Sequence, residues 1–221
     1  MTNSEILAHV DHTLLKADAS WQQLQTLCDE AVAYQTASIC INSGRVKQAV
    51  DYLSGRIPVC TVIGFPLGAA STQSKVLEAE QAEQDGAAEF DMVINIGRLK
   101  DGDAAFVQRD IEAVRRATPG RVLKVIIETC LLTEEEKKNM CEIVCNSGAD
   151  YIKTSTGFST AGATFADIEL FTRAVRGRVK IKAAGGIRTV DDMIRYIQMG
   201  ADRLGTSSAI RLLNEMQAQD Y

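Results

Sequence analysis

Eight short apolar segments, each followed by a stretch with helical periodicity, constrain the fold of this chain more than any other feature. The apolar segments are rich in residue types favoured in strands. They occupy residues 9–15, 38–41, 58–64, 88–94, 121–127, 149–157, 179–184 and 201–205. The helical stretches between and after them cover residues 21–34, 45–53, 74–85, 103–117, from 133 onward, 164–175, 189–200 and from 207 onward. Strands and helices that alternate in this way are typical of a parallel sheet covered by helices.

The predicted fold is α/β, a single-domain (β/α)8 TIM barrel that spans residues 1–221. An open, doubly wound sheet is the alternative, but such sheets usually contain fewer strands at this chain length. The sequence shows no linker and no low-complexity segment. Residues from about 217 to 221 are polar, and we expect them to form a short flexible tail.

The charge balance and the N-terminal sequence exclude several classes of protein. The formal net charge is −5, whereas nucleic-acid-binding domains usually carry a clustered basic excess. The chain has no apolar run of membrane-spanning length, and its polar N-terminus does not resemble a signal peptide. We therefore expect a cytoplasmic protein that binds neither nucleic acid nor membranes.

The cysteines and histidines argue against a metal site. None of the six cysteines forms a C-x-x-C pair, so we interpret them as reduced thiols that act as small apolar residues. The only histidines are His9 and His12, whereas a catalytic zinc site usually requires two or three. The sequence therefore predicts no metal and no other cofactor.

Four of the charged residues within the apolar segments are expected at or just inside the carboxyl ends of the strands: Asp91, Lys124, Lys153 and Lys182. Buried strands of a parallel sheet are usually almost continuously apolar, so charges within them must be paired, hydrated or used for chemistry. In a barrel, the carboxyl ends of the strands surround the active site. Three lysines against one aspartate leave an excess of positive charge, which favours a catalytic role over a simple buried ion pair.

Lys153 is the predicted nucleophile. A neutral lysine amine attacks a carbonyl and forms an iminium, which withdraws electrons from the neighbouring carbon. Lys182, on the adjacent predicted strand, could supply an ammonium that disfavours a second positive charge at Lys153. Asp91 either orients a lysine and moves a proton, or only forms an ion pair with Lys124. Glu89 is expected outside the barrel.

Glycines and serines after the seventh and eighth strands predict a phosphate site. Barrels commonly bind phosphate in these two loops, with backbone N–H groups and a helix N-terminus. The residues concerned are Gly185, Gly186, Ser207 and Ser208, and Gly157 after Lys153 is a further candidate. Arg188 contacts the phosphate or lies on the surface. Tyr221, the last residue, is either part of a frayed end or a phenol that relays a proton at the barrel mouth.

Four motifs together resemble deoxyribose-phosphate aldolases. They are EFDMVIN at 89–95, KVIIET at 124–129, YIKTSTGF at 151–158 and KAAGGIR at 182–188. DHTLL at 11–15 and SICIN at 38–42 extend the resemblance over nearly the whole chain. The resemblance implies a class I, metal-independent aldolase on a barrel, which interconverts 2-deoxy-D-ribose 5-phosphate with acetaldehyde and D-glyceraldehyde 3-phosphate. It also implies a role in deoxynucleoside breakdown and a homo-oligomer, commonly a dimer.

Position by position, the resemblance implies that Lys153 forms the Schiff base, that Lys182 perturbs it and that Asp91 relays protons. The four residues of the two loops correspond to the phosphate site. Asp11, Thr13 and Lys124 match positions near the substrate. Some family members carry lysine where this chain has Phe158, so one positive contact to phosphate is missing at that position.

The residues themselves are compatible with two other functions. An isomerase or synthase that uses carboxylates as acid and base would form no covalent adduct and would tolerate loss of Lys153. A sugar-phosphate binding protein would show saturable binding without turnover. Only imine chemistry requires a neutral amine, and the lysine pair beside one aspartate favours that chemistry.

Overall fold

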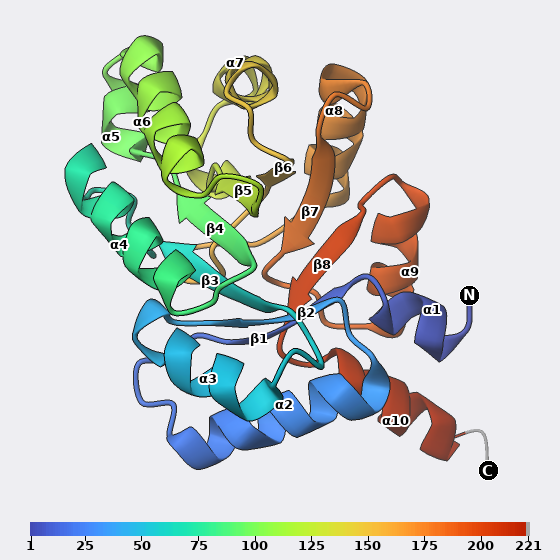
Figure 1. The fold of residues 1–221 in the computed structure, drawn as a ribbon. Helices are drawn as coiled ribbons and strands as arrows, with labels where there is room; N and C mark the ends of the chain where they lie inside the picture. Colours follow the sequence, from blue (N-terminus) through green and yellow to red (C-terminus); the bar gives the residue numbers. More distant parts are fainter. Residues whose placement is uncertain (220–221) are drawn as a thin grey trace.

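The computed structural model describes residues 1–219 and shows a closed barrel of eight parallel strands surrounded by helices (Figure 1). The strands pair in sequence order, and β8 closes the barrel against β1. They are β1 (Val10–Leu14), β2 (Ser38–Ile41), β3 (Val59–Ile63), β4 (Glu89–Val93), β5 (Val122–Ile126), β6 (Tyr151–Lys153), β7 (Lys180–Ala184) and β8 (Arg203–Thr206). The predicted (β/α)8 barrel is confirmed.

The helices follow the predicted order, with two short additions. The long helices are α2 (Trp21–Tyr34), α3 (Val46–Leu53), α4 (Thr72–Gln84), α6 (Ala104–Ala117), α7 (Glu134–Asn146), α8 (Phe165–Val175), α9 (Val190–Gln198) and α10 (Ala209–Gln219). The additions are α1 (Asn3–Leu7) and α5 (Ile96–Lys100), beside two 3₁₀ turns, η1 (Ser43–Arg45) and η2 (Thr129–Leu131). Residues 217–219, expected in a tail, continue α10. Tyr221 lies outside the described residues.

Side chains at the first turns explain where several helices begin. The Thr2 hydroxyl accepts a hydrogen bond from the backbone N–H of Glu5, whose carboxylate accepts one from the N–H of Thr2. This capping box satisfies N–H groups that α1 leaves unpaired, and so stabilises a helix of only five residues. Thr133 and Glu136 form the same arrangement at α7.

The apolar core lies between the sheet and the helices because side chains alternate along each strand. On β4, Phe90 and Met92 point outward and belong to the main core cluster, whereas Asp91 points into the barrel. A small second cluster fills part of the lumen and contains Leu15, Cys40, Cys60 and Val62, with Phe65 packed against it. The lumen is therefore partly apolar beside β2 and β3, and charged residues from β1, β4 to β7 and β8 fill the rest of it.

The helices that precede β1 and follow β8 lie side by side. Figure 1 shows α1 and α10 next to each other on the outside of the barrel, and residues of the two helices are in contact. None of the helices within residues 1–219 has the length and apolar character needed to cross a membrane.

Candidate active site

Lys153 and Lys182 share one carboxylate in the lumen. They are register partners on the adjacent strands β6 and β7, so their side chains enter the barrel at the same level. Each Nζ lies 2.6 Å from Oδ2 of Asp91, so the two nitrogens are no more than twice that distance apart. The strand register thus produces the lysine pair that the sequence predicted.

Asp91 is also bonded to Lys124, its register partner on β5, whose Nζ lies 2.9 Å from Oδ1. Burial by itself raises the pKa of the Asp91 carboxyl, but the charges of the neighbouring lysines, that of Lys124 most of all, outweigh burial and hold that pKa well below its usual range. Burial also opposes the charge on Lys182, yet the carboxylates of Asp11 and Asp91 raise the pKa of Lys182. Asp91 is therefore a carboxylate, and Lys182 is an ammonium.

Three further charged residues extend this cluster toward the other end of the barrel. Asp11 of β1 accepts hydrogen bonds from Lys182 and Arg203. Glu89 is almost fully buried, lies 2.6 Å from Lys124 and also contacts Arg203. The expectation that Glu89 lies outside the barrel is wrong. Because side chains alternate along a strand, Glu89 must point to the same side as Asp91, two residues later.

The charges in this lumen cluster balance only if one lysine is neutral. Its cations are Lys124, Lys153, Lys182 and Arg203, and its carboxylates are Asp11, Glu89 and Asp91. A net charge in a buried cluster is costly. With Lys153 as a free amine, three cations face three carboxylates. Lys153 also borders the cavity described next, so it is the amine that a carbonyl substrate can reach.

A cavity of about 410 Å³ opens at the carboxyl ends of the strands. Seven of the predicted residues line it: Thr13, Lys153, Gly157, Gly185, Gly186, Ser207 and Ser208. Asp11, Asp91, Lys124 and Lys182 do not line it and lie in the charged cluster around and below the Lys153 amine. Arg188 is exposed and does not line the cavity either. The structure therefore brings one reactive amine to the base of a cavity with glycine and hydroxyl residues at its rim.

The glycines at the rim are required by the backbone. Gly185 and Gly186 have φ angles of 77° and 73°, and Gly157 has 84°, a region that other residues rarely adopt. At Gly162, a β-carbon would lie 2.2 Å from the carbonyl carbon of Gly185, so the two loops can touch only with glycine at 162. This close packing brings the loop after β6 against the loop after β7.

A buried carboxylate shapes the loop after Lys153. Glu128, with a φ of 55°, accepts hydrogen bonds from the hydroxyl and the backbone N–H of Thr156. The Thr156 hydroxyl in turn accepts one from the N–H of Phe158 at 3.0 Å. These contacts fix the path of the backbone through Gly157, which lines the cavity.

Sequence reasoning did not identify several residues of the site. Thr156 and Thr206 line the cavity, and so does Lys16 after β1. Arg203 could have been recognised because it is a charged residue within the eighth apolar segment, as Lys153 and Lys182 are in theirs. Lys16 lies in a loop, where no periodicity indicates the direction of a side chain.

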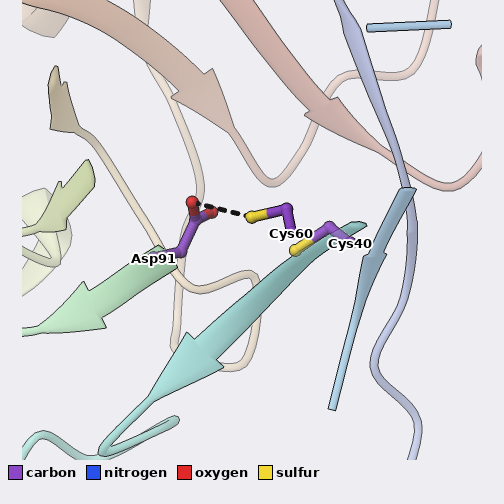
Figure 2. A group of neighbouring side chains, drawn as sticks. All are labelled: Cys40, Cys60 and Asp91. Carbon is purple, nitrogen blue, oxygen red and sulfur yellow. Dashed lines mark hydrogen bonds between the residues drawn. The ribbon is translucent and has the colours of Figure 1, made fainter. Parts of the chain in front are cut away.

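Cys40, Cys60 and Asp91 come close together in the lumen, on the neighbouring strands β2, β3 and β4 (Figure 2). Their sulfur and oxygen atoms lie within 4.8 Å of one another, a spacing that would suit a metal ion. The charges do not suit one. Burial and the neighbouring Asp91 raise the pKa of the Cys60 thiol well above its usual value, and three lysines already occupy Asp91. A dication would have to displace them, so we assign no metal to this group.

Gly205 leaves room for the Lys182 side chain. A β-carbon at position 205 would lie 2.9 Å from Cβ of Ala184 and 3.1 Å from Cε of Lys182. We expect Gly205→Ala to destabilise the fold by about 1–3 kcal/mol through overpacking and to lower activity by displacing Lys182. Thermal unfolding measures the first effect. Gly44→Ala is the matched control, because a β-carbon there meets nothing within 4 Å. Equal stability of the two variants would contradict the prediction.

The comparisons with known proteins point to one family. The model of the DeoC/LacD family aldolases matches residues 6–218. A deoxyribose-phosphate aldolase of Clostridium botulinum (strain Alaska E43 / Type E3) is 52% identical over 221 residues, which cover 100% of both chains. One from Clostridioides difficile (strain 630) is 51% identical over 98% of this chain and 99% of the relative.

Solved structures agree with this result. QR15, described as an aldolase, has a TM-score of 0.93 and 39% identity, over 98% of this chain and 97% of that chain. The deoxyribose phosphate aldolase of Aeropyrum pernix, described as a tetramer, has a TM-score of 0.88 and 27% identity, over 99% of this chain and 93% of that chain. Together with the full-length family match, these similarities show that the chain belongs to the DeoC/LacD family of aldolases.

Proposed function

We propose that the protein cleaves 2-deoxy-D-ribose 5-phosphate reversibly to acetaldehyde and D-glyceraldehyde 3-phosphate through a Schiff base on Lys153. The observation that carries this proposal is the Lys153 amine, which borders the cavity while it shares Asp91 with the Lys182 ammonium. The activity of the relatives from Clostridium botulinum and Clostridioides difficile supports the same reaction.

The reaction begins with attack of the Lys153 amine on C1 of the open-chain sugar. Proton transfers convert the resulting carbinolamine into an iminium and release water. A base then removes the proton of the C3 hydroxyl, the C2–C3 bond breaks, and its electron pair forms an enamine with the iminium. Glyceraldehyde 3-phosphate leaves, C2 takes up a proton, and water hydrolyses the imine to acetaldehyde and free Lys153.

Asp91 and Lys182 are the groups placed to move these protons. Both belong to the lumen cluster and form an ion pair with each other. Asp91 also contacts the reacting nitrogen of Lys153. A proton can therefore move between the carbinolamine and Lys182 or Asp91, and such a transfer leaves the total charge of the cluster and the bound intermediate unchanged. Lys124 and Asp11 hold these two groups in place, and no metal is needed to polarise the carbonyl.

The rim of the cavity is the proposed phosphate site. The loops with Gly185 and Gly186 and with Ser207 and Ser208 offer backbone N–H and hydroxyl donors, and α10 starts directly after Ser208. Gly157 lies on the same cavity and completes this side of the rim. Thr13 lies where it can contact the sugar.

The same family membership bears on the cellular location and the oligomeric state of the protein. We infer a cytoplasmic enzyme of deoxynucleoside breakdown whose single catalytic domain spans residues 1–221. Its partners are small phosphorylated aldehydes and sugars and further copies of the same chain. The tetramer described for the Aeropyrum pernix relative supports a homo-oligomer, either a dimer or a larger assembly. A proton relay by Tyr221 stays a prediction.

Reduction with borohydride in the presence of acetaldehyde tests the proposed chemistry. We expect an ethyl group on Lys153, located by peptide mass mapping, because borohydride traps the imine as a stable secondary amine. An adduct on Lys182 would keep the reaction class and reverse the roles of the two lysines. If folded protein in excess acetaldehyde gave no adduct, an acid–base enzyme or a sugar-phosphate binding protein would replace the proposal.

A further inference from the structure

We propose that Lys16 determines specificity by binding the phosphate group of the substrate at the mouth of the cavity. This inference rests on the function proposed above and adds a residue that neither the sequence motifs nor the phosphate loops include. Lys16 follows β1, and its side chain is exposed.

Charge in the cavity is the first argument. Among the residues described as lining the cavity, only Lys153 and Lys16 are ionisable. Lys153 is committed to the carbonyl carbon and to Asp91, at the base of the cavity. A phosphate monoester carries nearly two negative charges at neutral pH, and the backbone and hydroxyl donors at the rim carry none. Lys16 is therefore the cation available to it.

The position of Lys16 is the second argument. β1 pairs with β8, with His12 opposite Thr206, so the loop that follows β1 lies beside the loop that follows β8. Lys16 comes two residues after the end of β1, and Ser207 comes directly after β8. Both residues line the same cavity. A phosphate held by Ser207 and Ser208 thus lies within reach of a lysine side chain from the neighbouring loop.

The third argument is that the Lys16 side chain is not held by another side chain of the described residues. The backbone C=O of Lys16 accepts a hydrogen bond from the N–H of Ala19 at 3.2 Å, which closes a turn and fixes the main chain. Within residues 1–219, by contrast, the ammonium group makes no hydrogen bond and no ion pair to another side chain. The side chain also borders a smaller cavity of about 240 Å³ beside Arg45, so it can turn between the two spaces. A bound anion favours the position at the active site.

The other side of the cavity cannot supply the charge. Phe158 lines it there, with 54% of its surface exposed, and its ring packs edge-on against Phe65 with the centroids 5.2 Å apart. Phe65 follows β3 and Phe158 follows β6, so the aromatic contact crosses part of the barrel mouth. This wall is apolar, and Arg188 does not line the cavity. Among the described residues that line the mouth, the cation available to a phosphate therefore lies on the β1 side.

The test compares one pair of substrates across three variants. The substrates are 2-deoxy-D-ribose 5-phosphate and 2-deoxy-D-ribose, which differ only in the phosphate. The variants are Lys16→Gln, Lys16→Arg and Lys180→Gln; the last removes an equal charge at the start of β7, the opposite end of the barrel from the cavity. We expect Lys16→Gln to lower kcat/KM for the phosphorylated sugar by about 10-fold to 100-fold, mainly through KM, as for loss of a charge-assisted hydrogen bond.

The other measurements separate binding of phosphate from a structural effect. For 2-deoxy-D-ribose, kcat/KM should be unchanged in Lys16→Gln, and inhibition by inorganic phosphate should weaken in the same variant. Lys16→Arg should retain most of the preference for the phosphorylated sugar, and Lys180→Gln all of it. An unchanged ratio between the two substrates in Lys16→Gln, or an equal loss for both, would overturn the inference. If the unaltered enzyme cleaved neither sugar, the proposed function itself would fail.

Discussion

Replacement of Lys153 by alanine is expected to abolish aldol cleavage, with a fall in kcat on the order of 10⁴-fold or more, because the covalent route disappears with the amine. Lys182 cannot take over the attack. It is fully buried, is bonded to Asp11 and Asp91, and does not line the cavity. Release of D-glyceraldehyde 3-phosphate, followed with a coupled assay, measures the loss.

The same variant should fold. If Lys153 is a neutral amine, its removal leaves the lumen cluster with three cations and three carboxylates, and Asp91 keeps its bonds to Lys124 and Lys182. Water from the cavity can fill the space that the side chain leaves. We expect a loss of stability of about 1 kcal/mol, the typical value of one hydrogen bond. Lys180→Ala on the same sheet serves as the control. A Lys153→Ala protein that is folded and keeps most of its activity would disprove the Schiff-base mechanism.

The barrel and the lysine pair could be predicted because both follow from short-range periodicity. Eight alternations of strand and helix leave few folds to choose from, and strands that are consecutive in the sequence are neighbours in the barrel. Lys153 and Lys182 were therefore expected on adjacent strands, and their register in the structure places them at the same level. The two glycine and serine loops follow from the same order, since β7 and β8 are also neighbours.

The rest of the charged cluster was predicted less well, in part because the register between strands cannot be read from the sequence. Glu89 was misplaced although its distance of two residues from Asp91 required the same side of the strand. Arg203 reaches both Asp11 and Glu89 only because β8 closes against β1 and the strands are staggered around the barrel. The three lysines and Asp91 alone leave an excess of two positive charges. Once Asp11, Glu89 and Arg203 are counted with them, the excess is one.

The loops were the least predictable part. The contact between Phe65 and Phe158 joins segments almost a hundred residues apart, and it depends on a loop shape that Glu128 and Gly162 help to fix. The position of Lys16 depends likewise on the closure of the barrel between β1 and β8. Such contacts follow from the assembled fold, and no local pattern of apolar residues encodes them.

Replacement of Lys182 by methionine is expected to lower kcat by about 10²-fold to 10⁴-fold, the range typical of a lost proton-transfer group. It should also move the rise of kcat/KM to higher pH. Without the Lys182 charge, the remaining cations of the lumen are Lys124, Arg203 and Lys153, against the same three carboxylates. The cluster then balances only when Lys153 is an ammonium, which cannot attack a carbonyl. A higher pH is needed to free the amine.

The pH–rate profile distinguishes the two roles of Lys182. If Lys182 acts only through its charge, Lys182→Met should approach the activity of the unaltered enzyme once the pH is high enough to deprotonate Lys153. A deficit that persists on the plateau measures the contribution of Lys182 to proton transfer. Lys124→Met provides the comparison, because it removes another cation bonded to Asp91, from a residue whose register partner on β6 is Tyr151, two residues before Lys153. A profile of Lys182→Met with the same midpoint as that of the unaltered enzyme would refute the coupling.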